Sequence, residues 1–468
     1  MGLLYNELAQ QLLLNMEQGI WHPGERLPGV RALSQQRKVS VATVLSAYRQ
    51  LESLGHIEAR DRSGFYMRRK PASVSAPHIS SPSARPTPVT GHDMMLEMVR
   101  TSADPHVAQL GAAVPDISYM PSAAIEKAIT ASVRQERALS NSYVAPPGYA
   151  PLRRQIARHM ASFGCSVAPE EIVITNGCQE ALTLALRVLT KPGDTVAVES
   201  PAYYGLLRII DLLGLKALEI PTDPEQGMSV QALQLALENW DVKACVVIPN
   251  YNNPLGFCMP QSRRLELLNL LNMRNIPLVE DDIYGDLSHS HDRPGALKNF
   301  DKRGEVIYCS SFSKSLSPGL RLGWIVPGKY QAQVEYAKYV NNVSTSALPQ
   351  LAVTRLMEGG QYERHLRDVR PRLALSVERM LDACVRHFPE GTRITRPSGG
   401  FLLWAELPED IDTFALAQKA LKEKISIAPG ALFSARGKYQ NFMRLSCALR
   451  ENFPLEGAVA TLGRLMSG

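Results

Sequence analysis

The sequence predicts an α/β fold class, in which helices cover both faces of a mostly parallel sheet. Six short apolar runs recur beyond residue 170, and helical patterns separate most of them. Buried strands of a parallel sheet have such continuous apolar runs. Polar motifs follow several of the runs, at the strand ends where ligands bind in sheets of this kind. The predicted strands are residues 172–175, 195–199, 244–249, 278–281, 306–309 and 322–326.

Length and composition set the limits of this fold. A chain of 468 residues predicts two or three domains, and 45% apolar residues exclude wholesale disorder. The net charge is +6, of which +4 falls on residues 1–70 and indicates a module that faces nucleic acid. No bilayer-length apolar run and no secretory signal is evident, so we expect a cytoplasmic protein without a membrane partner. The seven cysteines have no paired spacing and no His-Glu-x-x-His motif occurs, so we expect reduced thiols and no metal site.

The first seventy residues have the pattern of a winged helix-turn-helix. The first helix is predicted from an apolar stripe of Tyr5, Leu8, Ala9, Leu12 and Met16. A second helix is predicted over residues 28–36, and a third begins after Ser40, which is a good N-cap. Residues 57–60 and 65–67 predict two short strands that form a hairpin. The start of the third helix can reach base edges in a major groove.

Arginines in this segment are candidates for phosphate contacts. They are Arg31, Arg49, Arg60 and Arg62. A small helical domain used for protein contacts is the alternative that the pattern leaves open. Residues 23–34 read P-G-E-R-L-P-G-V-R-A-L-S, and residues 39–55 read V-S-x-x-T-V-x-x-A-Y-x-x-L-x-x-x-G. Both segments resemble the GntR-type winged-helix DNA-binding domain.

The resemblance to GntR-type domains implies a set of DNA contacts. The implied residues are Arg31, Ser40, Thr43, Arg62, Ser63 and Gly64. Ser40 is equally compatible with a helix cap and nothing more. Val41 stands where the family often has arginine, so an arginine–guanine contact is excluded there, and either apolar contact with a thymine methyl or no readout remains.

A linker follows the winged helix. Residues 71–90 contain five prolines and five serines, a composition that forms neither a core nor a regular helix. Fully extended, roughly 25 residues at about 3.1 Å each span on the order of 75 Å. We therefore predict a winged-helix domain over 1–70, a linker over 71–95 and a large domain over 96–468.

Two charged residues of the large domain stand at predicted strand ends. Lys314 lies in Ser-Phe-Ser-Lys just after the strand 306–309, where burial lowers the pKa of a lysine and frees its amine to attack an aldehyde. Asp281 ends the strand 278–281, where a carboxylate can keep a pyridinium nitrogen protonated. Taken alone, each residue is also compatible with an ordinary surface charge or turn.

Two further motifs follow strands. Asn253 stands in Asn-Tyr-Asn-Asn-Pro-Leu-Gly, which offers an amide donor in a fixed turn. Residues 175–180 open a helix, and backbone N–H groups at such a start can hold a phosphate. The joint occurrence of these motifs in this order favours a site over a set of ordinary turns.

From about Gln109 onward, these motifs resemble the fold-type I aminotransferases that depend on pyridoxal 5′-phosphate, most closely the aspartate and kynurenine branch. The resemblance implies that Lys314 bonds the cofactor covalently and that Asp281 partners its pyridinium nitrogen. It implies that Asn253 and Tyr284 donate to the phenolic oxygen. The implied stacking residue and phosphate cup are Tyr203, Cys178, Gln179, Ser311, Ser313 and Arg321.

The same resemblance implies residues at the edge of the pocket. Tyr143 matches a tyrosine that reaches the phosphate in the neighbouring subunit. Arg444 matches the arginine that grips a carboxylate through two hydrogen bonds, and Gly111 is placed on the loop beside the substrate. Cys178 departs from the small hydroxyl residues common at its position. Because the backbone N–H binds the phosphate there, we expect the cysteine to be tolerated.

The combination of a GntR-type winged helix, a Pro-rich linker and an aminotransferase domain resembles the MocR subfamily of bacterial transcriptional regulators. The resemblance implies a homodimer that binds a double-stranded DNA operator. It implies that the cofactor-bearing domain, with a small C-terminal α/β subdomain, senses a small amine, amino acid or vitamer. A working aminotransferase that carries a DNA-binding domain is the alternative, because no matched pocket residue is missing. For the same reason a scaffold with a dead pocket is disfavoured.

Overall fold

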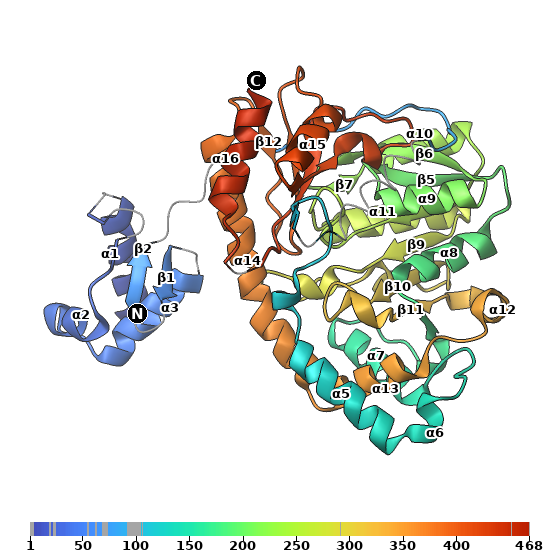
Figure 1. Ribbon diagram of the computed structural model, residues 1–468, viewed down its shortest axis with the longest axis horizontal. Helices are drawn as coiled ribbons and strands as arrows, with labels where there is room; N and C mark the ends of the chain where they lie inside the picture. The colour runs from blue at the N-terminus through green and yellow to red at the C-terminus, as the bar shows by residue number, and fades with distance from the viewer. Residues whose placement is uncertain are drawn as a thin grey trace. The chain divides into compact units, whose positions relative to one another are not determined.

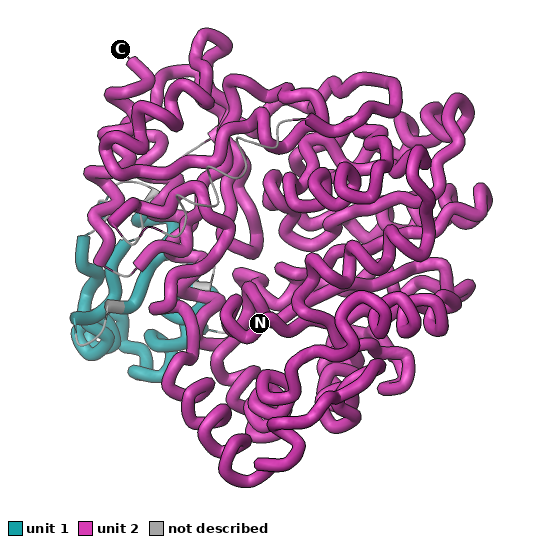
Figure 2. Tube along the Cα trace, turned by 45° about the vertical axis from the view of Figure 1, so that its right-hand side comes forward, with its two compact units in different colours: residues 1–73 teal, residues 74–468 magenta. Residues whose placement is uncertain are grey.

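The computed structural model describes residues 4–17, 20–21, 25–53, 56–60, 63–67, 74–90, 104, 106–290, 292–450 and 452–467. The chain forms two compact units, residues 1–73 and residues 74–468 (Figure 2). Among the described residues, none of the helices has the length and apolar character needed to cross a membrane.

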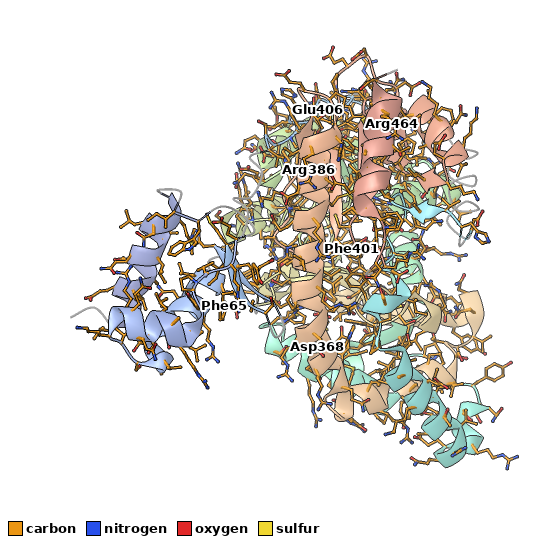
Figure 3. All side chains as sticks on the ribbon, turned by 60° about the vertical axis from the view of Figure 1, so that its left-hand side comes forward. Phe65, Asp368, Arg386, Phe401, Glu406 and Arg464 are labelled. Atoms are coloured by element: carbon orange, nitrogen blue, oxygen red, sulfur yellow. The ribbon has the colours of Figure 1, made fainter. Side chains whose placement is uncertain are left out.

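The N-terminal unit has the predicted winged-helix elements. They are α1 (Leu4–Glu17), α2 (Val30–Arg37), α3 (Val41–Ser53), β1 (Ile57–Arg60) and β2 (Gly64–Met67). The apolar stripes of α1 and α3 meet in one small core, in which Leu12, Val44 and Tyr48 are fully buried. Phe65, labelled in Figure 3, packs on Tyr48 with its ring centroid 4.7 Å away.

Two details of this unit differ from the prediction. The second helix begins at Val30 rather than residue 28, because Gly29 at its N-cap is extended, with φ −58° and ψ 144°. Residues 25–27 add a third extended segment to the wing, since Leu27 N donates to Phe65 O and Met67 N to Glu25 O, both at 2.8 Å. This segment has only three residues, which is too short for an alternating apolar pattern that would predict the pairing.

The large unit is built on an eight-stranded sheet in the order β4-β11-β10-β9-β8-β5-β6-β7 (Figure 1). Neighbouring strands from β10 to β6 run parallel, while β11 and β7 run antiparallel to the strands beside them. The α/β prediction is confirmed, and β6 and β7 are the strands that it missed. The bounds are β4 (Val173–Thr175), β5 (Thr195–Ser200), β6 (Lys216–Asp223), β7 (Gly227–Met228), β8 (Val242–Val247), β9 (Leu278–Asp281), β10 (Val306–Ser311) and β11 (Gly323–Val326).

Both faces of the sheet are covered because successive strand residues point to opposite sides. Val196 and Val198 of β5 pack in the cluster that contains α8 (Cys178–Leu189) and α9 (Tyr204–Leu212). Ala197 between them packs in the cluster that contains α10 (Val230–Asn239) and α11 (Gln261–Arg274). This arrangement leaves only the strand ends open for a site.

A smaller four-stranded sheet lies in the C-terminal part of the unit. Its order is β12 (Arg393–Ile394), β13 (Leu402–Glu406), β16 (Phe442–Ser446) and β15 (Ala428–Pro429). A short parallel pair joins β3 (Ala108–Gln109) to β14 (Ile425–Ser426). The remaining helices are α5 (Ser122–Gln135), α6 (Arg137–Ser140), α7 (Ala150–Ser162), α12 (Gln331–Asn342), α13 (Ala347–Glu358), α14 (Gln361–His387), α15 (Thr413–Lys422) and α16 (Leu455–Met466).

Residues 74–90, which are part of the segment predicted as a linker over 71–95, lie on the large unit. His78 N donates to Glu406 Oε2 at 2.8 Å, and Glu406 is labelled in Figure 3. Thr87 and Ala217 exchange two backbone hydrogen bonds of 2.9 Å at the edge of β6. An extended Pro-rich segment leaves its backbone groups unpaired, so the surface of a neighbouring domain can bind them. We call residues 74–90 the strap.

Candidate cofactor and effector site

A cavity of about 550 Å³ opens where β9 and β10 end and α8 begins. Most of the predicted pocket residues line it, namely Cys178, Gln179, Tyr203, Asn253, Asp281, Tyr284, Ser313, Lys314 and Arg321. The sequence analysis missed six other lining residues, which are Ala113, Val114, Leu182, Tyr204, Ile248 and Ile283. Five of these six are apolar and have no chemical signature. Tyr204 and Ile283 could have been found from their place beside Tyr203 and between Asp281 and Tyr284.

Lys314 is the nucleophile candidate of the cavity. It stands in the turn after β10, beyond the buried Ser311 and Phe312. Burial, together with the positive charges of Arg444 and Arg321, lowers the pKa of Lys314 to about 8. A larger fraction of the amine is therefore neutral near pH 7 than for a solvated lysine, which favours attack on an aldehyde.

Asp281 provides the buried carboxylate. Its side chain is 3% exposed, and burial raises its pKa to about 7. The Cys178 thiol donates a hydrogen bond of 3.2 Å to Asp281 Oδ1. Burial also raises the pKa of Cys178 well above its ordinary value, so the thiol stays protonated and acts as a donor. A cationic ring nitrogen beside Asp281 would stabilise the ionised carboxylate.

Arg444 and Asn253 connect two ends of the pocket. Arg444, on β16, is fully buried, and its Nη1 donates to Asn253 Oδ1 at 2.9 Å. Asn253 Nδ2 in turn lies 3.4 Å from Tyr284 OH. Arg444 Nη2 donates to Gly111 O at 2.5 Å, and Arg444 Nε has no partner within the described residues. A ligand carboxylate that accepts a hydrogen bond from Arg444 Nε would therefore bind the same arginine that holds Asn253, the asparagine predicted to face the cofactor ring.

Gly111 is fixed by its close approach to β15. A Cβ on Gly111 would lie 2.6 Å from the carbonyl carbon of Ile427. Only glycine therefore lets the backbone carbonyl of this residue reach Arg444. Gly111 contacts the arginine behind the cavity and is not among the residues that line it.

The start of α8 forms the predicted phosphate seat. Gly177 is its N-cap with φ +82°, and a Cβ there would lie 2.8 Å from Arg321 Nη2. The first N–H groups of a helix have no partner within it, and the helix dipole favours an anion at this end. Arg321 Nη2 also donates to Asn176 O at 3.0 Å, which fixes the loop. Ser311 and Ser313 are buried beside it, with Ser313 N donating to Ser311 Oγ at 3.2 Å.

Two tyrosines form one wall of the cavity. Tyr203 and Tyr204 have ring centroids 5.2 Å apart, and Tyr203 OH lies 3.4 Å from Gln179 Oε1. A Cβ on Gly205 would lie 2.4 Å from the Tyr203 ring, so this glycine makes room for it. The Tyr204 ring lies 5.4 Å from the Arg444 guanidinium carbon.

Tyr143 is another predicted residue that does not line the cavity, as is also true of Gly111, Ser311 and Arg444. Its side chain is 83% exposed, and it stands between α6 and α7. A tyrosine in this position cannot reach the cavity wall of its own chain, so only its predicted role toward a second subunit remains open.

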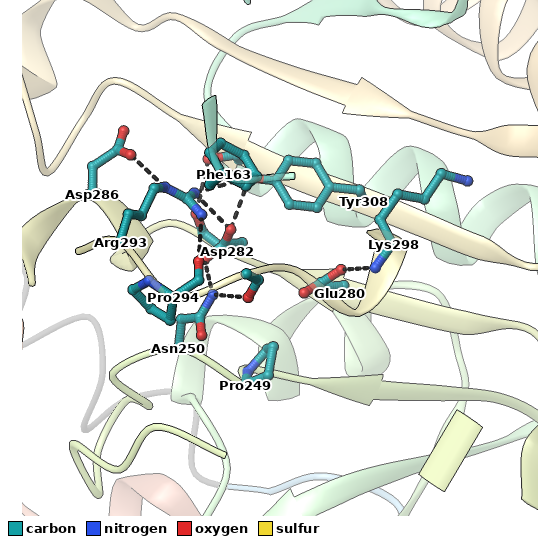
Figure 4. A network of polar contacts seen from close by, with 12 residues as sticks. Phe163, Pro249, Asn250, Glu280, Asp282, Asp286, Arg293, Pro294, Lys298 and Tyr308 are labelled. Carbon is teal, nitrogen blue, oxygen red and sulfur yellow. Dashed lines mark hydrogen bonds and ion pairs between the residues drawn. The ribbon is translucent and has the colours of Figure 1, made fainter. Parts of the chain in front are cut away.

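A second buried polar network begins at the residue after Asp281. Arg293 donates to Asp282 Oδ2 at 2.7 Å and to Asp286 Oδ1 at 2.5 Å (Figure 4). Tyr308 OH and Asn250 Nδ2 each donate to Asp282 at 2.9 Å. Burial opposes ionisation of Asp286, but His159 and Arg293 hold its pKa well below its ordinary value. The polar groups of this network pair with one another, so the network fixes the path of the chain beneath the cavity.

Two of the predicted DNA contacts of the N-terminal unit, Arg31 and Ser40, are exposed, and Thr43 is partly buried. Val41 is 44% exposed at the start of α3. Ser40 Oγ accepts a hydrogen bond of 3.0 Å from Thr43 N, so Ser40 caps the helix whether or not it also contacts DNA.

The wing carries the remaining predicted DNA contacts. Ser63 Oγ lies 2.6 Å from Tyr66 OH. Gly64 has φ +105°, a conformation that favours glycine. Arg62 lies outside the described residues.

Comparison with known proteins agrees with both parts of the chain. Residues 109–462 match the family of class I and II aminotransferases, and residues 4–67 match the gntR family of bacterial regulatory proteins. The HTH-type transcriptional regulator YjiR of Escherichia coli is 40% identical over 95% of each chain. The regulator YdcR of the same organism is 38% identical over 99% of this chain and 98% of its own. The α-aminoadipate aminotransferase LysN of Thermus thermophilus has a TM-score of 0.75 at 31% identity, covering 79% of this chain and 94% of its own.

The fold and the site thus define a GntR-type DNA-binding domain joined to a fold-type I aminotransferase domain. The chain belongs to the MocR subfamily of transcriptional regulators, which has this architecture along its whole length. The cofactor of the aminotransferase domain is pyridoxal 5′-phosphate. Its chemistry when bound is that of an aldehyde that captures amines and a ring that withdraws electrons from them.

The residues of the cavity fit this cofactor. Lys314, whose pKa is lowered, matches the aldehyde. The buried carboxylate of Asp281 matches the ring nitrogen. The N-terminus of α8, with Arg321 beside it, matches the phosphate. Arg444 lies behind the cavity and donates to Asn253 of its lining.

Proposed function

We propose that this protein regulates transcription by coupling the occupancy of the cavity to DNA binding. In this proposal Lys314 holds pyridoxal 5′-phosphate covalently, an amine or amino-acid effector binds beside it, and a double-stranded DNA operator binds the winged helix. The observation that carries the proposal is that Lys314 and Asp281 line one cavity, with Arg444 bonded to Asn253 of the same lining, in a chain that also has a GntR-type domain. DNA binding also implies a cytoplasmic location.

Each pocket residue has a proposed task. Lys314 attacks the aldehyde of the cofactor, and Asp281 keeps the ring nitrogen protonated. Asn253 and Tyr284 orient the phenolic oxygen, and Tyr203 stacks on the ring. The phosphate cup is Cys178, Gln179, Ser311, Ser313 and Arg321, and the effector contacts are Arg444 and Gly111.

A homodimer is part of the proposal. On α12, Tyr336, Tyr339 and Val340 are 73%, 55% and 60% exposed, and Tyr143 is 83% exposed. Apolar side chains gathered on one helix face are typical of surfaces that another chain covers. We expect size-exclusion chromatography with light scattering to give twice the mass of the chain, and the dimer to dissociate in Tyr336→Glu/Val340→Glu.

Transamination is the second candidate function. A working aminotransferase needs an arginine to bind the substrate carboxylate and a lysine to transfer protons, and this chain has Arg444 and Lys314 for these tasks. Incubation with amino acids should then convert the bound cofactor to its amine form, with loss of visible absorbance and release of a keto acid. If the bound cofactor keeps its visible absorbance with every amino acid, transamination is refuted and transcriptional regulation remains as the proposed function.

The deciding experiment tests cofactor and DNA together. The purified protein should be yellow, and Lys314→Ala should be colourless. Wild-type protein that is reduced with borohydride and then dialysed against fresh cofactor should also be colourless. Selection of genomic fragments by the wild type and by Lys314→Ala, each with and without cofactor, should enrich an operator whose occupancy depends on cofactor only in the wild type. Equal enrichment in all four samples would refute the proposed coupling.

The coupling has a thermodynamic consequence that can be measured directly. An effector that shifts DNA binding must itself bind with a different affinity when operator is present, and the two factors are equal. A coupling of about 1–3 kcal/mol corresponds to a change of roughly 5- to 150-fold. Titration of effector against visible absorbance, with and without saturating operator, should give two different dissociation constants.

A further inference from the structure

A buried lysine lies outside the cavity and directly behind the phosphate seat. Lys338 is on α12, and its side chain is 1% exposed. Its Nζ donates to Glu180 Oε2 at 2.7 Å and to Thr345 Oγ1 at 2.8 Å. A lysine is almost never this buried unless a partner charge requires it.

Glu180 is the partner charge, and it is the third residue of α8. Glu180 Oε2 also accepts a hydrogen bond of 2.6 Å from Asn176 N, and Oε1 accepts one of 3.2 Å from Asn341 Nδ2. The carboxylate therefore reaches back from the helix to the loop that carries the phosphate seat. Arg321 holds the carbonyl of Asn176 from the other side. Together these contacts fix the backbone N–H and the backbone C=O of one loop residue.

The same carboxylate creates an electrostatic conflict. The N-terminus of α8 favours an anion, and the phosphate of the cofactor carries about two negative charges near neutral pH. A carboxylate in the first turn of that helix repels the phosphate. Because the Glu180 side chain is only 10% exposed, solvent screens this repulsion weakly. The pair can therefore help phosphate binding only if its net charge is zero.

We propose that Lys338 is a positioning residue for the cofactor phosphate. It cancels the charge of Glu180 and holds its carboxylate in place. Glu180 can then fix the Asn176 peptide without repelling the phosphate. The proposal rests on cofactor binding at Lys314 and adds a residue that makes no contact with the cavity.

The test measures affinity for two probes, pyridoxal 5′-phosphate and pyridoxal, with the full-length protein freed of cofactor by hydroxylamine. Lys338→Met leaves an unpaired carboxylate and should weaken binding of the phosphorylated probe by about tenfold or more. Glu180→Gln should bind it at least as tightly as the wild type, because an amide still accepts from Asn176. The double variant Lys338→Met/Glu180→Gln should return to within about threefold of the wild type. Pyridoxal, which has no phosphate, should bind all four proteins alike.

Lys298→Met is the matched control. Lys298 is another buried lysine of the large unit, with an ion pair of 2.9 Å to Asp301, and it does not line the cavity. Its loss should lower Tm without a selective loss of affinity for the phosphorylated probe. If Lys338→Met does not fold, a Glu180→Gln variant that binds the phosphorylated probe more weakly than the wild type overturns the proposal.

Other results would overturn the proposal as well. Equal affinity of the wild type and Lys338→Met for pyridoxal 5′-phosphate would refute this inference alone and leave the cofactor site standing. A double variant as weak as Lys338→Met, or an equal loss for pyridoxal, would assign Lys338 a structural role only. Failure of the wild type to bind either probe would remove both this inference and the proposed function.

Discussion

The two units of the chain hold their functional side chains in opposite ways. In the large unit, Asp281 and Arg444 are buried, and other protein groups hold them before any ligand arrives. In the winged helix, Arg31 and Ser40 are exposed on the surface. A buried polar group costs free energy unless its partners are present, whereas an exposed one is solvated at no cost. Substitutions in the large unit should therefore change stability and binding together, and those in the winged helix should change binding alone.

The largest expected effect concerns the network beneath the cavity. Arg293→Met removes the cation from Asp282 and leaves Asp286 with His159 alone, and the two carboxylate side chains are 0% and 9% exposed. Loss of one partner from a buried ion pair costs about 3–5 kcal/mol. Urea unfolding of the cofactor-free protein should show this loss. Arg386→Met is the control, because its ion pair with Glu456 is exposed and should cost less than about 1 kcal/mol.

A pH-dependent effect comes next. Burial raises the pKa of Asp281 to about 7, above its unfolded value, so the folded protein binds the extra proton. The contribution of Asp281 to the free energy of unfolding is fully present below about pH 4 and is lost as the pH rises toward 7. In the cofactor-free protein Asp281→Asn should remove this dependence, worth at most about 4 kcal/mol at neutral pH. Parallel pH profiles of Tm for the two proteins would contradict the burial argument.

The winged helix should show the opposite behaviour. Arg31→Ala should weaken operator binding by about 1–3 kcal/mol. Because Arg31 is exposed on α2, its loss should leave Tm within the error of the wild type. If two domains each neutralise three to five phosphates, log K should fall against log salt with a slope of roughly −5 to −9, and the variant should have a shallower slope. A fall in Tm comparable to that of Arg293→Met would break the contrast between the units.

Sequence reasoning predicted the parallel strands well and missed β6 for a physical reason. The strand has the sequence K-A-L-E-I-P-T-D, in which a glutamate and a proline interrupt the apolar run. Glu219 is buried there because Ser200 and Ser434 donate to it at 3.1 and 3.2 Å. Pro221 is tolerated because it stands opposite Ser200, the last residue of β5, where the parallel pairing of the two strands ends. Partners so distant in the sequence cannot be read from a local pattern.

The cavity divides in the same way. Asp281, Asn253 and Lys314 could be predicted because each polar residue follows a strand. The apolar wall could not, since Val114 and Ile248 look like any core residues. Residues 71–95 were predicted as a linker because their composition indicates no core. The hydrogen bonds that hold the strap come from residues distant in the sequence, such as Trp240, whose Nε1 donates to Ala84 O at 3.0 Å.

The smallest effect tests the one residue that belongs to both kinds of region. Ser40 caps α3 through Thr43 N and is also exposed where DNA is expected to bind. Ser40→Ala should cost about 1 kcal/mol of stability through the lost cap, whether or not Ser40 contacts DNA. Ser40→Asp separates the two roles, because aspartate is as good an N-cap as serine but places a negative charge at the proposed interface. We expect Ser40→Asp to keep the Tm of the wild type and to lose operator affinity. Retention of both would make Ser40 a cap and nothing more, and would move the DNA contact of α3 to Val41, Thr43 and the residues beyond them.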